Sequence, residues 1–424
     1  MEALVLIAQG YQMFLLVFLV IYMIQHFVFS YNRLYSEQKN YYHDIIDEDV
    51  PMISVVIPMH NEELVANHIL DRIVVSDYPQ EKMEIIPIND HSTDRTGEIL
   101  DTYAQKYPNI KPFHRIKDEE KRGKAESLNE AMERCNGRII VVFDADYMPA
   151  KEVIKSLVIG FKDPQVGAVM GRVLVGNSDT NLLTILLDME RSAGYQVGQQ
   201  ARYNMDLIPQ YGGTVGAYRK SVMTQMGGFD TKVLAEDTDL TYKMYLNGWK
   251  VAYANKIECY EQMPESWMDR ARQVRRWARG HNEVLFKHLP SIFTSKYFSL
   301  KAKWDGLLLL MVYMMPVLLF IGIVNSIFLF FADSISIINS MTALILIMAI
   351  NAFGNFAPFF QIAMANYLDG RTHALKLIPL FAFNFVLYVF YASRGFFDAI
   401  VDTVSKREVD WDKTKRYQRN QNVK

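Results

Sequence analysis

The stretch Arg138-Ile-Ile-Val-Val-Phe-Asp-Ala-Asp146 joins a short apolar run to two carboxylates that follow it. A run of this length, rich in Val and Ile and bounded by polar residues, is typical of a strand buried on both faces of a sheet. Two similar runs lie upstream, ISVVIP at 53–58 and MEIIPI at 83–88, and helix-like segments separate the three. This alternation predicts βαβ units, and therefore an α/β domain with a mainly parallel sheet.

Acidic side chains follow each of the three predicted strands. Glu62 comes after the first, Asp90 after the second, and Asp144 and Asp146 after the third. Because ligands of open α/β sheets bind beyond the carboxyl ends of the strands, we expect these residues to share one site. Mg²⁺ and Mn²⁺ prefer oxygen ligands and often complete their shell with substrate phosphates. The pattern predicts Mg²⁺ or Mn²⁺ on a diphosphate, whereas Asp-x-Asp in an ordinary loop is the alternative.

Two further polar clusters precede predicted helices. Lys124 lies in KRGKAESLN, and a cation beside a helix N-terminus forms an anion site, although a solvated basic turn fits the same residues. The stretch AEDTD at 235–239 includes Glu236 and Asp237. Such acids either favour the positive end of a helix or supply a general base in a cleft. The chain lacks the glycine-rich motifs of NAD-binding proteins and P-loop ATPases, which argues against both classes.

The segment Arg270-x-x-Gln273-x-x-Arg276-Trp277 carries an aromatic residue among cations. Spacings of three and four residues place Arg270, Gln273 and Trp277 on one face of a helix, with Arg276 beside it. An aromatic ring can stack on a sugar while an arginine neutralises a leaving diphosphate. A basic helix on a membrane surface is the alternative reading.

Both ends of the chain are apolar. The run from Ala3 to Phe29 has no charged residue, and about 20 such residues cross a hydrocarbon core of roughly 30 Å. The acidic start at Glu2 argues against a cleaved signal peptide. Three more apolar stretches lie at 306–331, 335–367 and 375–401. We therefore expect a transmembrane helix at 1–30, about three more within 305–401, and a basic tail at 402–424.

The polar middle segment is expected to be cytosolic. Arg270 to Lys303 holds nine Lys or Arg against one acid, Glu283, and basic residues beside a span mark the cytoplasmic side. Three crossings after this segment would place the basic tail outside, which contradicts the same rule. Either one apolar stretch is re-entrant or interfacial, or one holds a broken double pass.

Composition excludes several classes of protein. The 424 residues carry a net charge of −2, which argues against a generally basic nucleic-acid binder. The two cysteines, Cys135 and Cys259, are too far apart in sequence for a paired metal or redox motif and are too few for a disulfide framework.

The ordered motifs PMHNEE, INDHSTDRT, GKAESLN, FDADYMP, GGTVGAYRK, AEDTDL and QVRRW resemble the membrane-embedded family 2 glycosyltransferases. The Gln-x-x-Arg-Trp element marks their processive branch, the polysaccharide synthases of the poly-N-acetylglucosamine, hyaluronan, chitin and cellulose type. Size and arrangement are closest to bacterial exopolysaccharide synthases. The resemblance implies a GT-A-like domain at 31–262, an interfacial amphipathic segment with the QxxRW motif at 263–304, and a multi-pass protein of the plasma membrane.

The resemblance also implies roles for individual residues. Contacts to the nucleotide and diphosphate fall to Glu62, Asp90, Lys124, Asp144 and Arg276. The metal ligand is Asp146, the base and its supporting acid are Asp237 and Glu236, and the acceptor end is bound by Gln273 and Trp277. The stretch from Gly213 to Arg219 lines the acceptor path.

The resulting hypothesis is a processive inverting β-glycosyltransferase. It polymerises a UDP-activated hexose or N-acetylhexosamine, with the growing polysaccharide as acceptor, and couples synthesis to export through the lipid bilayer. The resemblance allows a small accessory membrane subunit and implies no nucleic acid. Two alternatives stay open: a non-processive glycolipid glycosyltransferase, and a transporter or receptor whose cytosolic domain only binds a nucleotide.

Overall fold

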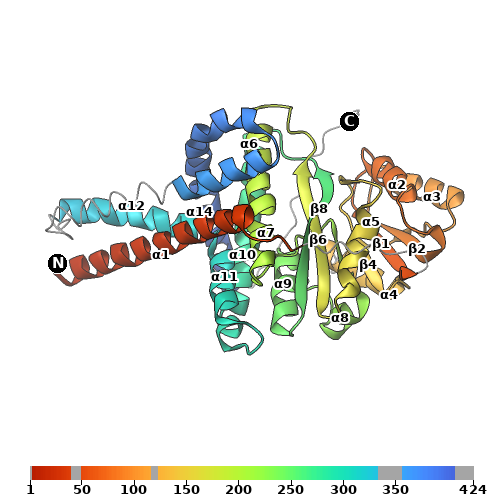
Figure 1. Cartoon of the computed structure of the whole chain (residues 1–424), viewed down its shortest axis with the longest axis horizontal. Coiled ribbons are helices and arrows are strands. Elements are labelled where there is room, and N and C mark those ends of the chain that lie inside the picture. Colours follow the sequence, from red (N-terminus) through yellow and green to blue (C-terminus); the bar gives the residue numbers. More distant parts are fainter. Residues whose placement is uncertain (1, 40–48, 116–122, 333–355, 406–424) are drawn as a thin grey trace.

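The structure, a computed structural model, describes residues 2–39, 49–115, 123–332 and 356–405. An eight-stranded sheet with the order β3-β2-β1-β4-β7-β6-β8-β5 forms its centre (Figure 1). The strands are β1 (Ile53–Met59), β2 (Met83–Asn89), β3 (Phe113–His114), β4 (Ile139–Val142), β5 (Met148–Pro149), β6 (Val166–Val175), β7 (Gly216–Arg219) and β8 (Lys250–Glu261). The three strands predicted from the apolar runs are thus present as β1, β2 and β4.

The sheet is mixed, so the prediction of a mainly parallel sheet is corrected. β1 runs parallel to β2 and β4, and β6 runs parallel to β8. β7, however, enters between β4 and β6 antiparallel to both, and β5 pairs antiparallel with β8. The chain reverses into β7 after Gly213 and Val215, which both have positive φ. Such a reversal depends on backbone conformation, and the glycine-rich stretch that contains β7 carries no strand pattern.

Alternate residues of the central strands enter two separate cores, as a strand covered on both faces requires. Val55 and Val141 pack in one core with helices α2 and α5, whereas Val56 and Val142 pack in the other with α4, α8 and α9. Their bounds are α2 (Ala66–Val74), α4 (Lys124–Arg134), α5 (Val153–Ile159), α8 (Lys220–Gln225) and α9 (Glu236–Leu246). Both cysteines are buried and free.

The remaining helices connect the sheet to the apolar ends. They are α1 (Glu2–Tyr35), α3 (Thr96–Lys106), α6 (Leu182–Ser192), the π-helix η4 (Ala193–Gln199), α7 (Gln200–Asn204), α10 (Trp267–Thr294), α11 (Leu300–Met311), α12 (Met315–Phe331) and α14 (Phe381–Ser405). Short 3₁₀ turns are η2 (Gln80–Lys82), η3 (Gly160–Lys162) and η5 (Thr372–Leu380), and residues 356–368 are helical. α3 begins at Thr96, whose backbone N–H donates to Asp94 Oδ1 at 3.0 Å.

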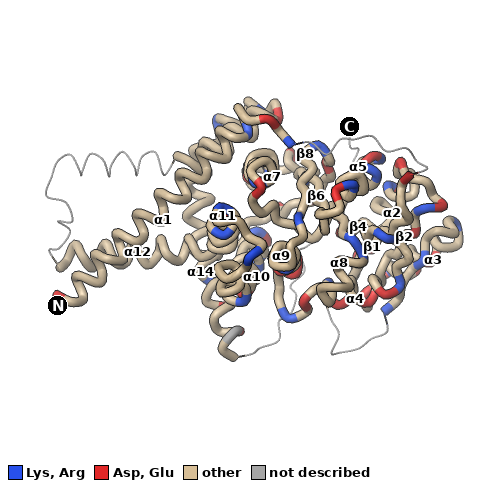
Figure 2. Tube along the Cα trace, turned by 60° about the horizontal axis from the view of Figure 1, so that its bottom comes forward, with Lys and Arg blue, Asp and Glu red and all other residues tan. Residues whose placement is uncertain are grey.

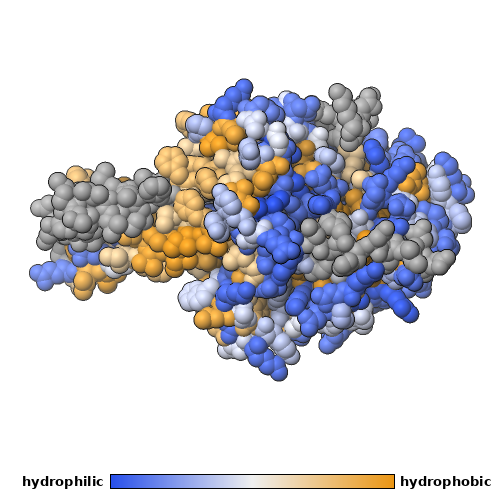
Figure 3. Space-filling view, in the orientation of Figure 1, coloured by the Kyte–Doolittle hydropathy of each residue, from blue (hydrophilic) through white to orange (hydrophobic). Residues whose placement is uncertain are grey.

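Two apolar helices lie side by side and project away from the sheet. α1 packs along α12, while α14 packs along α10 (Figure 1). Charged residues gather over the sheet and are sparse along α1 and α12 (Figure 2). The hydrophobic surface likewise covers the helical part rather than the sheet (Figure 3).

Within the described ranges, two helices are long and apolar enough to cross a membrane, at Glu2–Tyr35 and Thr372–Asp402. Helices α11 and α12 meet at a bend of 71°. Only if these two helices together form one span does the described chain have a third candidate span. The expectation of four spans is therefore not supported by the described chain. Much of the predicted stretch 335–367 lies outside the described residues, as does most of the basic tail.

Candidate active site

One cavity of about 1000 Å³ opens beyond the carboxyl ends of β1, β2 and β4. It lies where the topology of an open α/β sheet places a ligand. Every residue to which the sequence analysis gave an individual role lines it: Glu62, Asp90, Lys124, Asp144, Asp146, Glu236, Asp237, Gln273, Arg276 and Trp277. These residues span more than 200 positions of sequence, and the fold brings them to one hollow. Their individual roles stay predictions.

One end of the cavity is formed by the loops that follow β1 and β2. The Asp90 carboxylate pairs with the buried guanidinium of Arg115 and lies 2.9 Å from His91 Nδ1. Arg115 also pairs with Glu130 of α4 at 2.9 Å, so α4 holds the Asp90 loop through a charged bridge. His60 Nδ1 lies 2.6 Å from the Asp90 carbonyl oxygen and ties the two loops together. This end presents carboxylate and imidazole groups that could bind the polar edge of a nucleoside.

Lys124 lines the cavity among carboxylates that come from different elements. It is the first residue of α4 and follows Gly123, whose φ of +107° an L side chain rarely adopts. Its ammonium nitrogen lies 2.7 Å from Asp144 Oδ1 and 3.9 Å from Glu236 Oε1, and it donates to the Gly213 carbonyl at 3.0 Å. Burial disfavours its charge, but the neighbouring carboxylates outweigh burial and raise the pKa of Lys124. The Lys124 ammonium group therefore keeps its positive charge beside the carboxyl groups of Asp144 and Glu236.

Glu236 and Asp237 form the first turn of α9 and face the same space. Burial raises the pKa of both carboxyls, and it brings that of Glu236 to about 7 despite the opposing charge of Lys124. Asp237 Oδ1 accepts hydrogen bonds from the backbone N–H of Thr238 at 2.6 Å and from its hydroxyl at 3.3 Å. A carboxylate with a raised pKa in a cleft is suited to accept a proton near neutral pH.

Asp146 is buried in the cavity wall, next to Asp144. Among the residues that the structure describes, no group of three or more His, Cys, Asp or Glu side chains is placed to hold a metal ion. Asp144 already pairs with Lys124. A single protein carboxylate together with diphosphate oxygens suits Mg²⁺ or Mn²⁺, which usually keep waters and phosphates in their shell. The donor set therefore fits a metal that binds with the diphosphate.

The opposite end of the cavity is built by α10. Arg270 donates to Gln273 Oε1 at 2.8 Å, and its guanidinium lies 5.1 Å from the centre of the Trp277 ring. The guanidinium of Arg191, from α6, lies 5.2 Å from the same ring. Arg270, Gln273 and Trp277 therefore lie on one face of α10, as the spacing predicted. Because two cations hold it, the Trp277 indole has little freedom to turn away.

Three residues of the apolar helices reach this end of the cavity. Leu309, Val312 and Tyr313 line it, and they lie at the bend between α11 and α12. The rings of His281 and Tyr313 are tilted by 58° with their centres 4.8 Å apart, and burial lowers the pKa of His281 to about 4. The cavity therefore runs from a polar, carboxylate-lined end to an apolar end beside the candidate spans.

Several cavity residues were not predicted: Arg191, Tyr195, Gln199, Arg202, Gln210, His281 and Glu261. Most come from the segment 182–210, whose amphipathic pattern reads as an ordinary helix and carries no recognisable motif. Of the predicted acceptor path from Gly213 to Arg219, Thr214 lines the cavity, as does Gly212 just before the path. Tyr218 is fully buried and Arg219 donates to main-chain carbonyls, including that of Val166, because β7 carries both into the sheet.

The sequence of the domain matches a known family over residues 51–280, more than half of the chain, and that family is described as "Glycosyltransferase like family 2". The chain belongs to this family. A relative, "Probable glycosyltransferase YdaM" of Bacillus subtilis (strain 168), is 32% identical over 383 residues, which cover 87% of this chain and 88% of that protein. The family assignment makes the chain a glycosyltransferase with a GT-A-like fold for nucleotide-sugar donors.

Two further proteins are similar to this glycosyltransferase. "Beta-monoglucosyldiacylglycerol synthase" of Synechocystis sp. (strain ATCC 27184 / PCC 6803 / Kazusa) is 29% identical over 274 residues, 63% of this chain and 55% of that protein. The solved mannosyltransferase PcManGT from Pyrobaculum calidifontis, in complex with GDP-Man and Mn²⁺, has a TM-score of 0.56 at 20% identity and covers 89% and 97% of the two chains. The similarity to the mannosyltransferase concerns the fold alone.

Proposed function

We propose that this glycosyltransferase transfers a hexose or N-acetylhexosamine from a UDP-sugar, with inversion, to an acceptor hydroxyl at the membrane end of the cavity. One observation carries the proposal: Lys124, Asp146, Asp237 and Trp277 line the same hollow. A cation, a carboxylate for a metal, a buried carboxylate and an aromatic platform are the groups that this reaction needs. A transporter or receptor that only binds a nucleotide has no need of Asp237 and Trp277 together.

The donor would lie along the floor of the cavity. Glu62 and Asp90 contact the nucleoside, Asp144 lies beside it, and Lys124 and Arg276 contact the diphosphate. Asp146 is the proposed ligand of Mg²⁺ or Mn²⁺, and a bound ion would supply positive charge to the diphosphate. The Mn²⁺ and GDP-Man named for the solved mannosyltransferase of the same fold support a metal-bound diphosphate.

The proposed chemical step is a single displacement. Asp237 takes the proton of the acceptor hydroxyl as its oxygen attacks the anomeric carbon from the face opposite the leaving group. The bond between the anomeric carbon and the diphosphate breaks, and UDP leaves with its negative charge near Lys124 and Arg276. Glu236 supports Asp237, since the two half-buried carboxyls lie in one helical turn. Gln273 and Trp277 orient the acceptor so that its hydroxyl faces Asp237.

The first candidate product is a polysaccharide that is extended processively and exported through the bilayer. The Gln273-to-Trp277 element and the size of the cavity favour it. About 1000 Å³ is at the top of the range for ordinary ligand pockets, roughly 300–1,000 Å³, so donor and acceptor end fit together. In this reading the protein is multi-pass, its catalytic domain is cytosolic, and a small accessory membrane subunit joins the complex. The basic residues at 270–303 support the cytosolic side.

The second candidate is a single transfer to a lipid acceptor. The relative named as a beta-monoglucosyldiacylglycerol synthase favours it. The apolar lining of Leu309, Val312 and Tyr313 at the bend of α11 and α12 also suits a lipid. The two candidates share the donor, the base and the metal, and differ only in the acceptor.

A donor and product screen tests the function. The full chain in lipid nanodiscs receives Mg²⁺ or Mn²⁺ and a panel of UDP-sugars, with and without diacylglycerol in the bilayer, and released UDP and product length are measured. UDP release with one sugar is expected. A ladder of products supports the polysaccharide, and a single glycolipid supports the lipid acceptor. No UDP release with any UDP-sugar overturns the proposed donor class. In sealed inverted vesicles, polymer found outside the vesicles rejects export.

A further inference from the structure

We propose that Asp369, in the segment that precedes the last candidate span, is a positioning residue for the catalytic carboxylate Asp237. It acts through the π-helix η4. This inference rests on the proposed function, because it takes Asp237 as the base. Asp369 does not line the cavity, and no motif identifies it.

The π-helix lies along the wall of the cavity. Gly194, Tyr195 and Gln199 of η4 line the hollow. A π-helix is rare because its wider turn costs hydrogen-bond geometry, and it occurs frequently at functional sites. Its persistence here needs support from outside the helix. That support comes from elements that are distant in sequence.

Three carbonyl groups in η4 accept side-chain hydrogen bonds from three different elements. Gln361, from the helix at residues 356–368, donates to the Ala193 carbonyl at 3.0 Å. Tyr253 of β8 donates to the Tyr195 carbonyl at 2.9 Å, and Arg33 at the end of α1 donates to the Gln196 carbonyl at 2.9 Å. The conformation of η4 is thus held jointly by the sheet and by the two segments that lead to the candidate spans.

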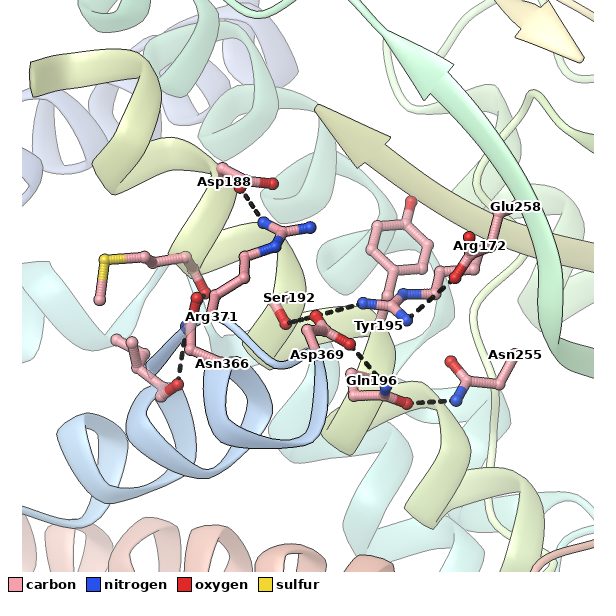
Figure 4. Close-up of polar contacts among 12 residues, drawn as sticks. Arg172, Asp188, Ser192, Tyr195, Gln196, Asn255, Glu258, Asn366, Asp369 and Arg371 are labelled. Carbon is pink, nitrogen blue, oxygen red and sulfur yellow. Dashed lines mark hydrogen bonds and ion pairs between the residues drawn. The ribbon is translucent and has the colours of Figure 1, made fainter. Parts of the chain in front are cut away.

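Asp369 is the charged centre of this support (Figure 4). Its carboxylate accepts from Gln196 Nε2 at 2.7 Å and from the Ser192 hydroxyl, and it pairs with the Arg172 guanidinium at 2.5 Å. The Asp369 and Arg172 side chains are only 6% and 4% exposed. A buried ion pair seldom adds net stability over apolar packing, but removing one partner leaves a buried charge. The pair therefore specifies one arrangement of η4 rather than simply strengthening the fold.

Hydrogen bonds continue from η4 to the base. Gln199 donates to the Gln210 carbonyl at 3.1 Å and accepts from its N–H at 3.0 Å. The Gln210 amide donates to the Thr238 hydroxyl at 2.8 Å, and Thr238 donates to Asp237. A displacement of η4 therefore moves Gln210 and Thr238, which orient the Asp237 carboxylate.

The structure offers a matched control at the same joint. Arg371 donates to Asp188 of α6, four residues before Ser192, and this pair also ties the C-terminal segment to α6 (Figure 4). Within the part of the chain that the structure describes, this pair makes no hydrogen bond to η4 and does not line the cavity. If Asp369 only docks the segment, loss of either pair has the same effect. If Asp369 orients the base, only its own loss slows the reaction.

The experiment compares Asp369→Asn with Asp188→Asn in the full chain in nanodiscs. We expect Asp369→Asn to lower kcat about tenfold, with the KM for the UDP-sugar changed less than twofold, and Asp188→Asn to retain kcat. Asp369→Glu should recover part of the loss, because it restores the charge. Equal kcat for Asp369→Asn and the unaltered chain, or equal losses in both variants that follow their Tm, overturns the proposal.

A double-mutant cycle tests the route. Gln199→Ala breaks the link to Gln210 without touching Asp369, so the double variant with Asp369→Asn should be no slower than the slower single variant. If the fold-losses in kcat of the two single variants multiply in the double variant, the two residues act independently and the proposed route is wrong. Should Asp369→Asn fail to fold, Gln196→Ala, which leaves the pair of Asp369 and Arg172, replaces it with the same expectation. Full activity of Asp237→Asn would refute the proposed base itself, independently of Asp369.

Discussion

The Lys124 ammonium nitrogen lies 2.7 Å from Asp144 Oδ1, so the first residue of α4 and the second residue after β4 form an ion pair in the cavity lining. Glu236 lies 3.9 Å from the same nitrogen. A cation held by acids before the substrate arrives is already oriented and needs little rearrangement to contact an anionic diphosphate. Its charge also makes the cluster of acids tolerable in a buried site.

Replacing this cation should weaken donor use strongly. Lys124→Met leaves Asp144, Glu236 and Asp237 without their common counter-charge, and we expect kcat/KM for the UDP-sugar to fall about 100-fold or more. Initial rates of UDP release measure the change. Lys39→Met is the matched control, since Lys39 forms an exposed pair with Asp206 and should keep normal rates. Equal rates for Lys124→Met and Lys39→Met would contradict the role of Lys124.

Loss of the proposed base should stop transfer. Asp237→Asn keeps the size of the side chain but removes its ability to take a proton, and general-base catalysis is typically worth about 10²- to 10⁴-fold. We expect a fall in kcat within that range, measured as product formed per enzyme. Asp101→Asn changes an exposed carboxylate paired with His114 and serves as the control. A kcat of Asp237→Asn within threefold of the control would reject the assignment.

The two tryptophans of α10 give a test of the acceptor end. Trp277 lines the cavity between Arg191 and Arg270, whereas Trp267, at the start of the same helix, is 42% exposed and lies outside the cavity lining. We expect Trp277→Ala to reduce kcat/KM for the acceptor by about 10- to 100-fold, because stacking and two cation–π contacts are lost. Trp267→Ala should leave it unchanged. Kinetics at saturating donor decide between them, and equal values would remove Trp277 from the acceptor site.

The pH dependence follows from the raised pKa values of the acid pair. Burial raises the pKa of Glu236 to about 7 and raises that of Asp237, so protons bind these carboxyls at higher pH than in water. Because transfer needs ionised Asp237, kcat should fall as the pH drops through the raised pKa values of this coupled pair. A pH–rate profile at saturating substrates measures this limb. Glu236→Gln removes one of the two coupled acids and should shift the limb to lower pH; a flat profile down to pH 5 in the unaltered chain would contradict the assignment.

Metal binding should depend on the nucleotide. Since the described chain has no cluster of three acidic or His side chains for a metal, Mn²⁺ alone is expected to bind weakly, and UDP should tighten binding at least tenfold. Calorimetric titration of Mn²⁺ with and without UDP measures the difference. Asp146→Asn should abolish the gain from UDP. Tight Mn²⁺ binding without UDP, retained in Asp146→Asn, would place the metal elsewhere.

The site could be predicted further than the fold around it. Asp90, Asp144 and Asp146 were found because polar residues directly follow buried apolar runs, and a parallel sheet brings such strand ends together. Arg191, Gln199 and Gln210 could not be found, since they lie on a segment whose helical pattern carries no motif. The direction of β7 was also missed, because Gly213 and Val215 reverse the chain through backbone torsions that composition does not reveal.

By itself, the amino-acid sequence determined the buried strands, the apolar ends and the residue types of the site, because hydrophobic pattern and local motifs act over a few neighbouring positions. Only the tertiary structure decided that α10 brings Trp277 to the same cavity as Lys124, that the sheet is mixed, and that Asp369 accepts a hydrogen bond from the π-helix that lines this cavity. Those relationships join residues far apart in the chain. They depend on how helices and strands pack against one another, which local pattern does not specify.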